Sequence, residues 1–302
     1  MRKRQIGSSD LYVSEVGLGC MSVGTEETRA IRLIDEAIDY GVNYLDTADL
    51  YDQGLNEEFV GKAIKHKRNS IILATKVGNR FEKGKQGWSW DPSKTYIMSA
   101  VKESLHRLQT DYIDLYQLHG GTIEDNIDEA IEAFEELKKE GYIRYYGISS
   151  IRPNVIREYV KRSSIVSVMM QYSILDRRPE EVFPLLEKHN ISIVARGPVA
   201  KGLLTERQMD ISDLEKGYLD YEGSELASVI STLKAIAGNR SLTELALQYC
   251  LSEPSVAAVV AGASKNEQLL ENIRAVQSNP LTESEIMQIK ESTKASLYAQ
   301  HR

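Results

Sequence analysis

Short apolar runs rich in β-forming residues alternate with amphipathic helical segments from residue 16 onward, and this alternation constrains the fold more than any other feature. Each run is short enough to form a strand that is buried on both faces. The eight runs are VGLGCM (16–21), NYLDTA (43–48), IILATKVG (71–78), DLYQLH (114–119), RYYGISS (144–150), SVMMQYS (167–173), SIVARGPV (192–199) and VAAVVAGAS (256–264). Repeated β and α units of this kind are typical of an α/β protein with a parallel sheet.

The segments between these runs carry the signals of helices. In segment 125–141, Ile127, Ile131 and Phe134 recur at helical spacing, acidic residues come early, lysines come late, and Gly141 follows as a stop. This order of charges agrees with the helix dipole. The segment therefore predicts an amphipathic helix that covers the sheet.

Two long polar stretches, 79–92 and 205–224, interrupt the alternation and are typical of functional loops. Within the first, Trp88 and Trp90 have two interpretations, as the lining of an apolar pocket or as anchors of the loop. Asp91, which is followed by a proline, predicts the N-cap of the next helix.

The repeat predicts one closed (β/α)₈ barrel over residues 1–302, because no interior linker rich in Pro, Gly or Ser divides the chain. The alternative is an open doubly wound sheet, which would carry a G-x-G-x-x-G turn after its first strand. Gly17, Gly19 and Gly24 miss that spacing. The opening segment predicts a β-hairpin with its turn at 7–10, which would plug the N-terminal end of the barrel.

Composition excludes several classes of function. The 302 residues include 37 Lys and Arg against 44 Asp and Glu, a net charge of −7, which argues against nucleic acid as a partner. The N-terminus lacks the apolar stretch of a signal peptide, and no run approaches the roughly 18 apolar residues of a membrane helix, so we expect a cytoplasmic protein without a membrane partner. Cys20 and Cys250 stand far apart without a Cys/His cluster; we expect buried thiols, no disulfide and no metal.

Four polar residues lie at or just after the C-terminal ends of predicted strands, where barrel enzymes hold their sites: Asp46, Tyr51, Lys76 and His119. Each alone has an ordinary structural explanation, such as a salt bridge or a core histidine. Together they could act as a proton donor with the groups that support it. We expect the Lys76 cation to make Tyr51 a usable acid, while Asp46 orients Lys76. His119 would then hydrogen-bond a carbonyl oxygen.

Four motifs, in chain order, resemble those of the aldo-keto reductase superfamily: VGLGCMSVG, YLDTADLYDQGLNEEFVGKAI, ILATKVG and YIDLYQLHG. The resemblance spans nearly the whole chain and is closest to the bacterial reductases related to potassium-channel β subunits. It implies a barrel enzyme that reduces carbonyl compounds with a nicotinamide cofactor. It also implies a catalytic tetrad of Asp46, Tyr51, Lys76 and His119, the same residues that the strand ends indicate.

The resemblance further implies a binding site for NADPH or NADP⁺. Ser149, Ser150 and Gln171 would hold the nicotinamide carboxamide, although Ser150 stands where the family commonly has Asn. Lys265, at the start of a helix, would meet the ribose 2′-phosphate. The remaining residues at matching positions are Gly19, Cys20, Met21, Arg196, Gly197, Pro198, Lys201, Gly202, Gly262, Ser264, Gln268, Glu271 and Asn272.

Arg196 departs from the family pattern, because many relatives have an aromatic residue here that packs on the nicotinamide ring. Three interpretations are open. The planar guanidinium can stack on the ring, it can bind the pyrophosphate, or it can form a structural ion pair.

These features predict an NADPH-dependent enzyme that reduces an aldehyde or ketone of small size, with the proton supplied by Tyr51. Two alternatives are a Schiff-base lyase that uses Lys76 as its nucleophile and a cofactor-binding, redox-sensing subunit without significant turnover. The first leaves Tyr51 and the adenosine-binding stretch around Lys265 without a role. A measurement of turnover would distinguish the enzyme from the redox-sensing subunit.

Overall fold

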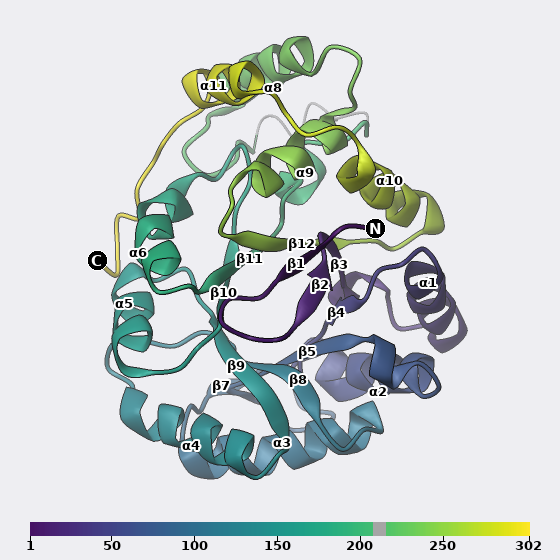
Figure 1. The fold of residues 1–302 in the computed structure, drawn as a ribbon, viewed down its shortest axis with the longest axis vertical. Helices are drawn as coiled ribbons and strands as arrows, with labels where there is room; N and C mark the ends of the chain where they lie inside the picture. Colours follow the sequence, from purple (N-terminus) through teal and green to yellow (C-terminus); the bar gives the residue numbers. More distant parts are fainter. Residues whose placement is uncertain (208–215) are drawn as a thin grey trace.

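The computed structural model describes residues 1–207 and 216–302, and eight parallel strands close into a barrel (Figure 1). Their order around the barrel is β10-β11-β12-β3-β4-β5-β8-β9. The strands are β3 (Val16–Gly19), β4 (Tyr44–Asp46), β5 (Ile72–Val77), β8 (Ile113–Leu118), β9 (Ile143–Ser149), β10 (Ser167–Gln171), β11 (Ser192–Arg196) and β12 (Val256–Gly262). Each overlaps one of the eight apolar runs, so the predicted (β/α)₈ barrel is confirmed.

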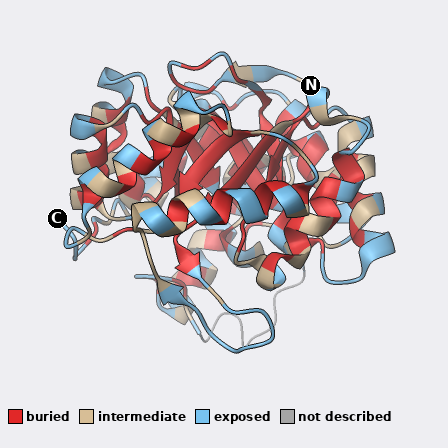
Figure 2. Cartoon of the chain, turned by 90° about the horizontal axis from the view of Figure 1, so that it is seen from below, coloured by how far each residue is buried: buried red, intermediate tan, exposed pale blue. Residues whose placement is uncertain are grey.

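Helices surround the barrel and turn their apolar faces to it, so that buried surface lies inward and exposed surface outward (Figure 2). They are α1 (Glu27–Asp39), α2 (Leu55–Ile64), α3 (Lys94–Leu108), α4 (Ile127–Lys139), α5 (Pro153–Arg162), α6 (Phe183–Lys188), α8 (Gly223–Ala237), α9 (Leu242–Ser252), α10 (Asn266–Gln277) and α11 (Glu283–Ser292). The helix predicted in segment 125–141 is α4. The last helix, α11, packs against α8 beside the barrel (Figure 1).

The N-cap predicted for α3 is wrong by two residues. The helix begins at Lys94, and the cap is Ser93, whose hydroxyl accepts a hydrogen bond from the backbone N–H of Tyr96 at 3.2 Å. The Asp91 carboxylate instead accepts from the backbone N–H of Ser93 at 3.2 Å. Asp91 therefore forms a turn before the helix, which is the other common role of an aspartate in such a position.

The N-terminal hairpin is confirmed as a plug of the barrel. Strands β1 (Lys3–Gln5) and β2 (Tyr12–Ser14) pair in antiparallel fashion. Ile6, Leu11 and Val13 are fully buried and pack among the side chains that fill the barrel interior. The hairpin thus closes the N-terminal end, and the opposite end, where the strands terminate, stays open for a site.

The two polar stretches differ from simple loops. Segment 79–92 contains a second hairpin of β6 (Asn79–Arg80) and β7 (Ser89–Trp90). Of segment 205–224, residues 208–215 lie outside the described part of the chain. The rest includes a short antiparallel bridge between Tyr218 and Tyr221, and α8 already begins at Gly223.

Gly61 of α2 lies against the end of α3. A Cβ at this position would lie 2.6 Å from the carbonyl carbon of Leu108 and 2.7 Å from the carbonyl oxygen of Arg107. Backbone atoms cannot move aside as a flexible side chain can. The close approach of the two helices therefore requires glycine.

We expect Gly61→Ala to lower the free energy of unfolding by roughly 1–3 kcal/mol, because overpacking outweighs the better helix propensity of alanine. The measurement is urea denaturation followed by circular dichroism. Ser228→Ala, at an exposed position of α8, is the matched control and should change stability little. A Gly61→Ala protein as stable as the wild type would contradict this account of the helix contact.

Candidate active site

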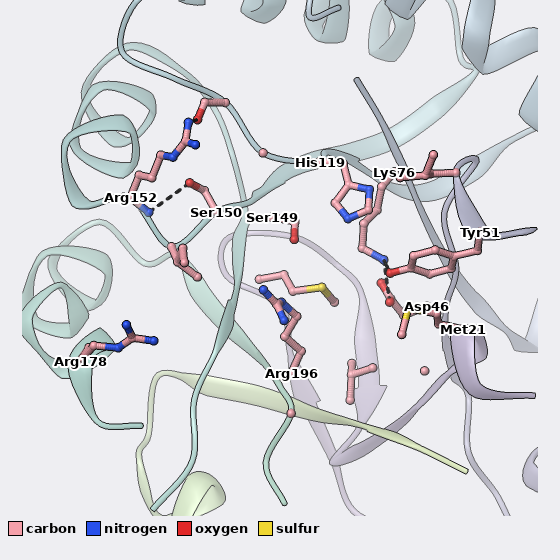
Figure 3. A pocket seen from close by; sticks show the side chains of 18 of the residues that line it. Met21, Asp46, Tyr51, Lys76, His119, Ser149, Ser150, Arg152, Arg178 and Arg196 are labelled. Carbon is pink, nitrogen blue, oxygen red and sulfur yellow. Dashed lines mark hydrogen bonds and ion pairs between the residues drawn. The ribbon is translucent and has the colours of Figure 1, made fainter. Parts of the chain in front are cut away.

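The four strand-end residues meet at one cavity of about 930 Å³ at the C-terminal end of the barrel (Figure 3). Asp46 ends β4, Lys76 lies one residue before the end of β5, and His119 follows β8 directly. Tyr51 begins a short 3-10 turn, η2 (Tyr51–Gly54), in the loop after β4. Neighbouring positions on adjacent parallel strands therefore bring together residues that are far apart in the sequence.

Lys76 is the centre of this group. Its ammonium donates to Asp46 Oδ2 at 2.7 Å, to the carbonyl oxygen of Thr47 at 2.7 Å and to the Tyr51 hydroxyl at 3.2 Å (Figure 3). The side chain is only 1% exposed. Burial opposes its charge, but Asp46 and then Tyr51 outweigh burial and raise its pKa. All three ammonium N–H groups thus have acceptors, and the lysine is held in its charged form.

The surroundings of Tyr51 make its hydroxyl a weaker acid than expected. Burial raises the pKa of the hydroxyl, and although the Lys76 cation opposes this effect, the net shift is upward. Lys76 thus acts in the expected direction, but desolvation of the mostly buried phenol is the larger effect. As a result, Tyr51 keeps its proton at neutral pH, which is the form that a proton donor needs.

His119 is neutral in this environment. Burial, followed by the positive charges of Lys76 and Arg196, lowers its pKa to about 3. Its ring meets that of Tyr51 edge to face, with centroids 6.0 Å apart. A neutral imidazole carries one N–H, so His119 can hydrogen-bond an oxygen atom without bringing a charge.

Gln117 is a polar neighbour of the tetrad that the sequence analysis missed. Its side-chain N–H donates to Asp46 Oδ1 at 3.4 Å, and its backbone is the register partner of Lys76 on the adjacent strand. Gln117 is fully buried. The signal in the sequence was a single amide within the apolar strand that leads to His119.

The opposite wall of the cavity comes from the ends of β9, β10, β11 and β12 and from the residues after β3. The cofactor residues predicted from the sequence that line it are Gly19, Met21, Ser149, Ser150, Arg196, Gly197 and Gly262. Arg196 is exposed, and no acidic side chain in the described ranges forms an ion pair with it. Its charge acts on Asp46, Tyr51 and His119. The structural ion pair proposed for Arg196 is therefore absent from the described part of the chain.

Other predicted cofactor residues do not line this cavity. Cys20 is fully buried, its thiol contacts the carbonyl oxygen of Leu18, and burial raises its pKa, so it belongs to the core. Gln171 donates from its amide to the Tyr218 hydroxyl at 3.0 Å. Pro198 is buried, and Lys201 and Gly202 belong to a 3-10 turn, η5 (Ala200–Gly202).

A second hollow of about 370 Å³ lies between α1 and the start of α10, where Ser264 and Lys265 are found. Arg29, which the sequence analysis did not identify, reaches into it from α1 and donates to the carbonyl oxygen of Ser264. Three more predicted residues lie on α10. Gln268 accepts a hydrogen bond from the backbone N–H of Ser264, and Glu271 accepts one from the Thr243 hydroxyl. Asn272 donates one to the carbonyl oxygen of Gly262. Because Gly262 lines the first cavity, residues 262–264 connect the two hollows.

The C-terminal segment is the largest part of the cavity wall that the sequence did not predict. Residues 298–301 line it, together with Arg152 and Arg178. The tail is fixed by a hydrogen bond from the backbone N–H of Asn154 to the carbonyl oxygen of His301 at 2.9 Å. An irregular segment has no periodic pattern, which is why its position could not be deduced.

Neither tryptophan of segment 79–92 lines this cavity. The Trp90 indole N–H donates to Asp125 at 3.0 Å, and its ring packs against Gly78 and Gly120. Trp88 is 57% exposed. Trp90 is thus an anchor of the loop, and the alternative as a pocket lining is wrong for both residues.

Within residues 1–207 and 216–302, no three His, Cys, Asp or Glu side chains are arranged to hold a metal ion. None of the helices in those ranges has the length and apolar character needed to cross a membrane.

Comparison with known proteins agrees with this geometry. The family model for the aldo/keto reductase family matches residues 15–294. The chain is 63% identical over 305 residues to the uncharacterized oxidoreductase YqkF of Bacillus subtilis (strain 168), covering 100% of both proteins. It is 29% identical over 324 residues to the NADH-specific methylglyoxal reductase of Escherichia coli (strain K12), covering 98% of this chain and 99% of that protein.

Among solved structures, the holo form of aldo-keto reductase AKR11C1 from Bacillus halodurans matches with a TM-score of 0.97 and 64% sequence identity. The match covers 100% of this chain and 99% of that one. The chain therefore belongs to the aldo/keto reductase family, whose members are oxidoreductases that use a nicotinamide cofactor.

Proposed function

We propose that this protein reduces an aldehyde or ketone of small size to an alcohol, with NADPH as its cofactor. The observation that supports this most strongly is the buried contact of Lys76 with Asp46 and Tyr51, which lies beside His119 at one cavity. It combines a protonated hydroxyl, a neutral hydrogen-bond donor and a fixed cation at the place where a carbonyl oxygen would gain negative charge.

The wall opposite the tetrad fits a nicotinamide group. The Ser149 hydroxyl faces the cavity. Gly262 has no side chain, and a Cβ there would lie 2.8 Å from the Ser22 hydroxyl oxygen. The cavity surface beside β12 is therefore formed by backbone. When bound, the nicotinamide supplies the hydride. The 262–264 connection to the second hollow suits a long dinucleotide that spans both cavities.

The residues of the tetrad then have separate roles. Tyr51 and His119 hydrogen-bond the carbonyl oxygen, and Tyr51 gives it a proton as the carbon is reduced. Lys76 stabilises the tyrosinate that remains, because its ammonium lies 3.2 Å from that oxygen. Asp46 keeps the ammonium charged and in place.

A Schiff base on Lys76 would have to begin from a neutral amine. Instead, the three acceptors around the ammonium hold it protonated, so the Schiff-base alternative is disfavoured. Borohydride trapping with a carbonyl substrate tests this: a covalent adduct on Lys76 would support the lyase. A redox-sensing subunit would bind NADPH without oxidising it in the presence of any of a panel of aldehydes and ketones.

Preference for NADPH over NADH rests on the charges of the second hollow. Three carboxylates line it: Glu26, Glu36 and Glu267. Glu26 caps α1, Glu36 pairs with Arg32 at 3.1 Å, and Glu267 forms no ion pair within the described residues. No ion pair to Arg29 or Lys265 occurs in the described residues. Two cations without acidic partners, beside the backbone of Ser264, suit a ribose 2′-phosphate.

We expect Tyr51→Phe to lower the rate of carbonyl reduction by roughly 10²–10⁴-fold, because the variant lacks the proton donor but keeps the shape of the ring. The dissociation constant of NADPH should change little. Steady-state NADPH oxidation and fluorescence titration measure the two quantities. Tyr12→Phe, on the exposed face of the N-terminal hairpin, is the control. A loss of cofactor affinity as large as the loss of rate would argue against this role.

We expect kcat/KM for carbonyl reduction to be flat between about pH 5 and pH 8, the range in which an ordinary histidine titrates. The pKa of His119 is lowered to about 3, so it is neutral throughout, and the raised pKa of Tyr51 keeps its proton in place. The rate should fall only in more alkaline solution. A step near neutral pH that disappears in His119→Asn would show that His119 does titrate there.

We expect Lys265→Ala to weaken NADPH binding by about 10- to 100-fold, the range for one charge-assisted hydrogen bond, and to leave NADH binding nearly unchanged. The measurement is equilibrium titration with both cofactors. Lys188→Ala, at the exposed end of α6, is the control. Equal weakening of both cofactors would mean that Lys265 does not contact the phosphate.

A further inference from the structure

The cavity is positively charged, although the chain as a whole carries a net charge of −7. Asp46 is the single acidic residue among the described residues that line it. Its charge is neutralised by Lys76, whose Nζ lies 2.7 Å from Asp46 Oδ2. Three guanidinium groups also line the cavity: Arg152, Arg178 and Arg196. A cavity of this charge attracts anions more strongly than the surrounding surface does.

Two of these arginines already have another role. Arg178 forms a two-bond ion pair with the buried Asp176, at 2.7 and 2.8 Å, and stacks on the Tyr298 ring at 4.8 Å. It therefore holds the C-terminal tail. Arg196 lies at the end of β11, on the wall proposed for the cofactor.

Arg152, like Arg196, has no acidic partner among the described residues, but it does not lie on that wall. Its guanidinium donates one N–H to the carbonyl oxygen of Gly121, and no ion pair to it exists in the described ranges. A guanidinium has five N–H donors, so several stay available to a ligand. The cavity thus contains a positive charge that the folded chain does not neutralise.

The position of Arg152 separates it from the cofactor. The proposed path of the cofactor starts at Ser149 on β9 and passes β10 and β11 to the hollow beside Lys265, beyond β12. Arg152 follows β9 and points away from Arg196 (Figure 3). It extends toward the loop after β8, where it contacts Gly121, and it lines the cavity together with residues 298–301. The cofactor phosphates therefore do not account for its charge.

We propose that the substrate is an aldehyde or ketone that bears an anionic group, a carboxylate or a phosphate, and that Arg152 binds this group. The carbonyl would lie at Tyr51 and His119, and the anion would point away from the cofactor toward the start of α5. Arginine suits this contact because its planar fork donates two parallel hydrogen bonds to either kind of anion. The inference rests on the proposed carbonyl reduction.

Matched pairs of carbonyl compounds test this proposal. Succinic semialdehyde and butanal differ by a carboxylate, and glyceraldehyde phosphate and glyceraldehyde differ by a phosphate. For each pair, the quantity measured is the ratio of kcat/KM for the charged compound to that for the uncharged one. We expect a ratio of at least about tenfold for one pair in the wild type, and a lower ratio at high salt. The pair with the larger ratio identifies the anion.

Variants then test whether Arg152 causes the preference for the charged compound. Arg152→Gln should lower the ratio by about tenfold or more, whereas Arg152→Lys should restore part of it, because the charge returns without the planar fork. Arg157→Gln removes an exposed arginine from α5, the helix that begins directly after Arg152, and should leave the ratio unchanged because Arg157 lies outside the cavity. Calorimetric titration of the NADP⁺ complex with succinate gives a readout that does not depend on turnover.

The outcomes separate the two proposals. If wild type reduces butanal and glyceraldehyde as well as their charged partners, or if Arg152→Gln keeps the preference, the anion proposal is overturned and carbonyl reduction stands. If none of the four carbonyl compounds is reduced, carbonyl reduction is overturned, whether or not succinate binds.

Discussion

The buried ammonium of Lys76 is the interaction on which the site depends. Taking such a charge out of water costs several kcal/mol, and only well-placed acceptors can repay that cost. The barrel supplies them, because Asp46 on β4 lies beside β5, which carries Lys76, and the loop after β4 returns Thr47 and Tyr51 to the same ammonium. Closure of the sheet and stability of the charge are therefore linked. A strand shifted by one residue would turn Lys76 away from all of its partners.

Burial and this cation together set the protonation of the neighbouring groups. Burial, followed by the charges of Lys76 and Arg196, lowers the pKa of His119 so far that the imidazole is neutral at any physiological pH. The Lys76 cation opposes, but does not overcome, the effect of burial on the pKa of Tyr51. The site therefore holds a protonated phenol, a neutral imidazole and an ammonium, which is a set suited to donate hydrogen bonds and a proton to an oxygen atom. None of these groups has to change charge before an uncharged substrate binds.

The sequence predicted the barrel and the four tetrad positions because both follow from short-range patterns. Strands are marked by apolar runs, and a residue that ends a barrel strand faces the open end. The features that the sequence did not predict depend on contacts between distant or irregular segments. The position of residues 298–301 is set by the hydrogen bond from Asn154 to His301, and the position of the Arg152 side chain by its hydrogen bond to Gly121. The error at Asp91 arose because two residues that can cap a helix stand close together, and only the geometry distinguishes them. The net pKa of Tyr51 needed the depth of burial, which a sequence does not give.

Arg196 is where the chain departs from the pattern of its relatives, and its surroundings argue for one of the interpretations that the sequence left open. Its charge acts on Asp46, Tyr51 and His119, so the guanidinium belongs to the tetrad end of the cavity rather than to the hollow beside Lys265. This favours a place by the nicotinamide ring over one at the pyrophosphate. The oxidised ring is cationic, whereas the reduced ring is neutral. With the nicotinamide bound as proposed, a fixed positive charge at this point would disfavour the oxidised cofactor relative to the reduced one, an effect that an aromatic residue in the same position would not have.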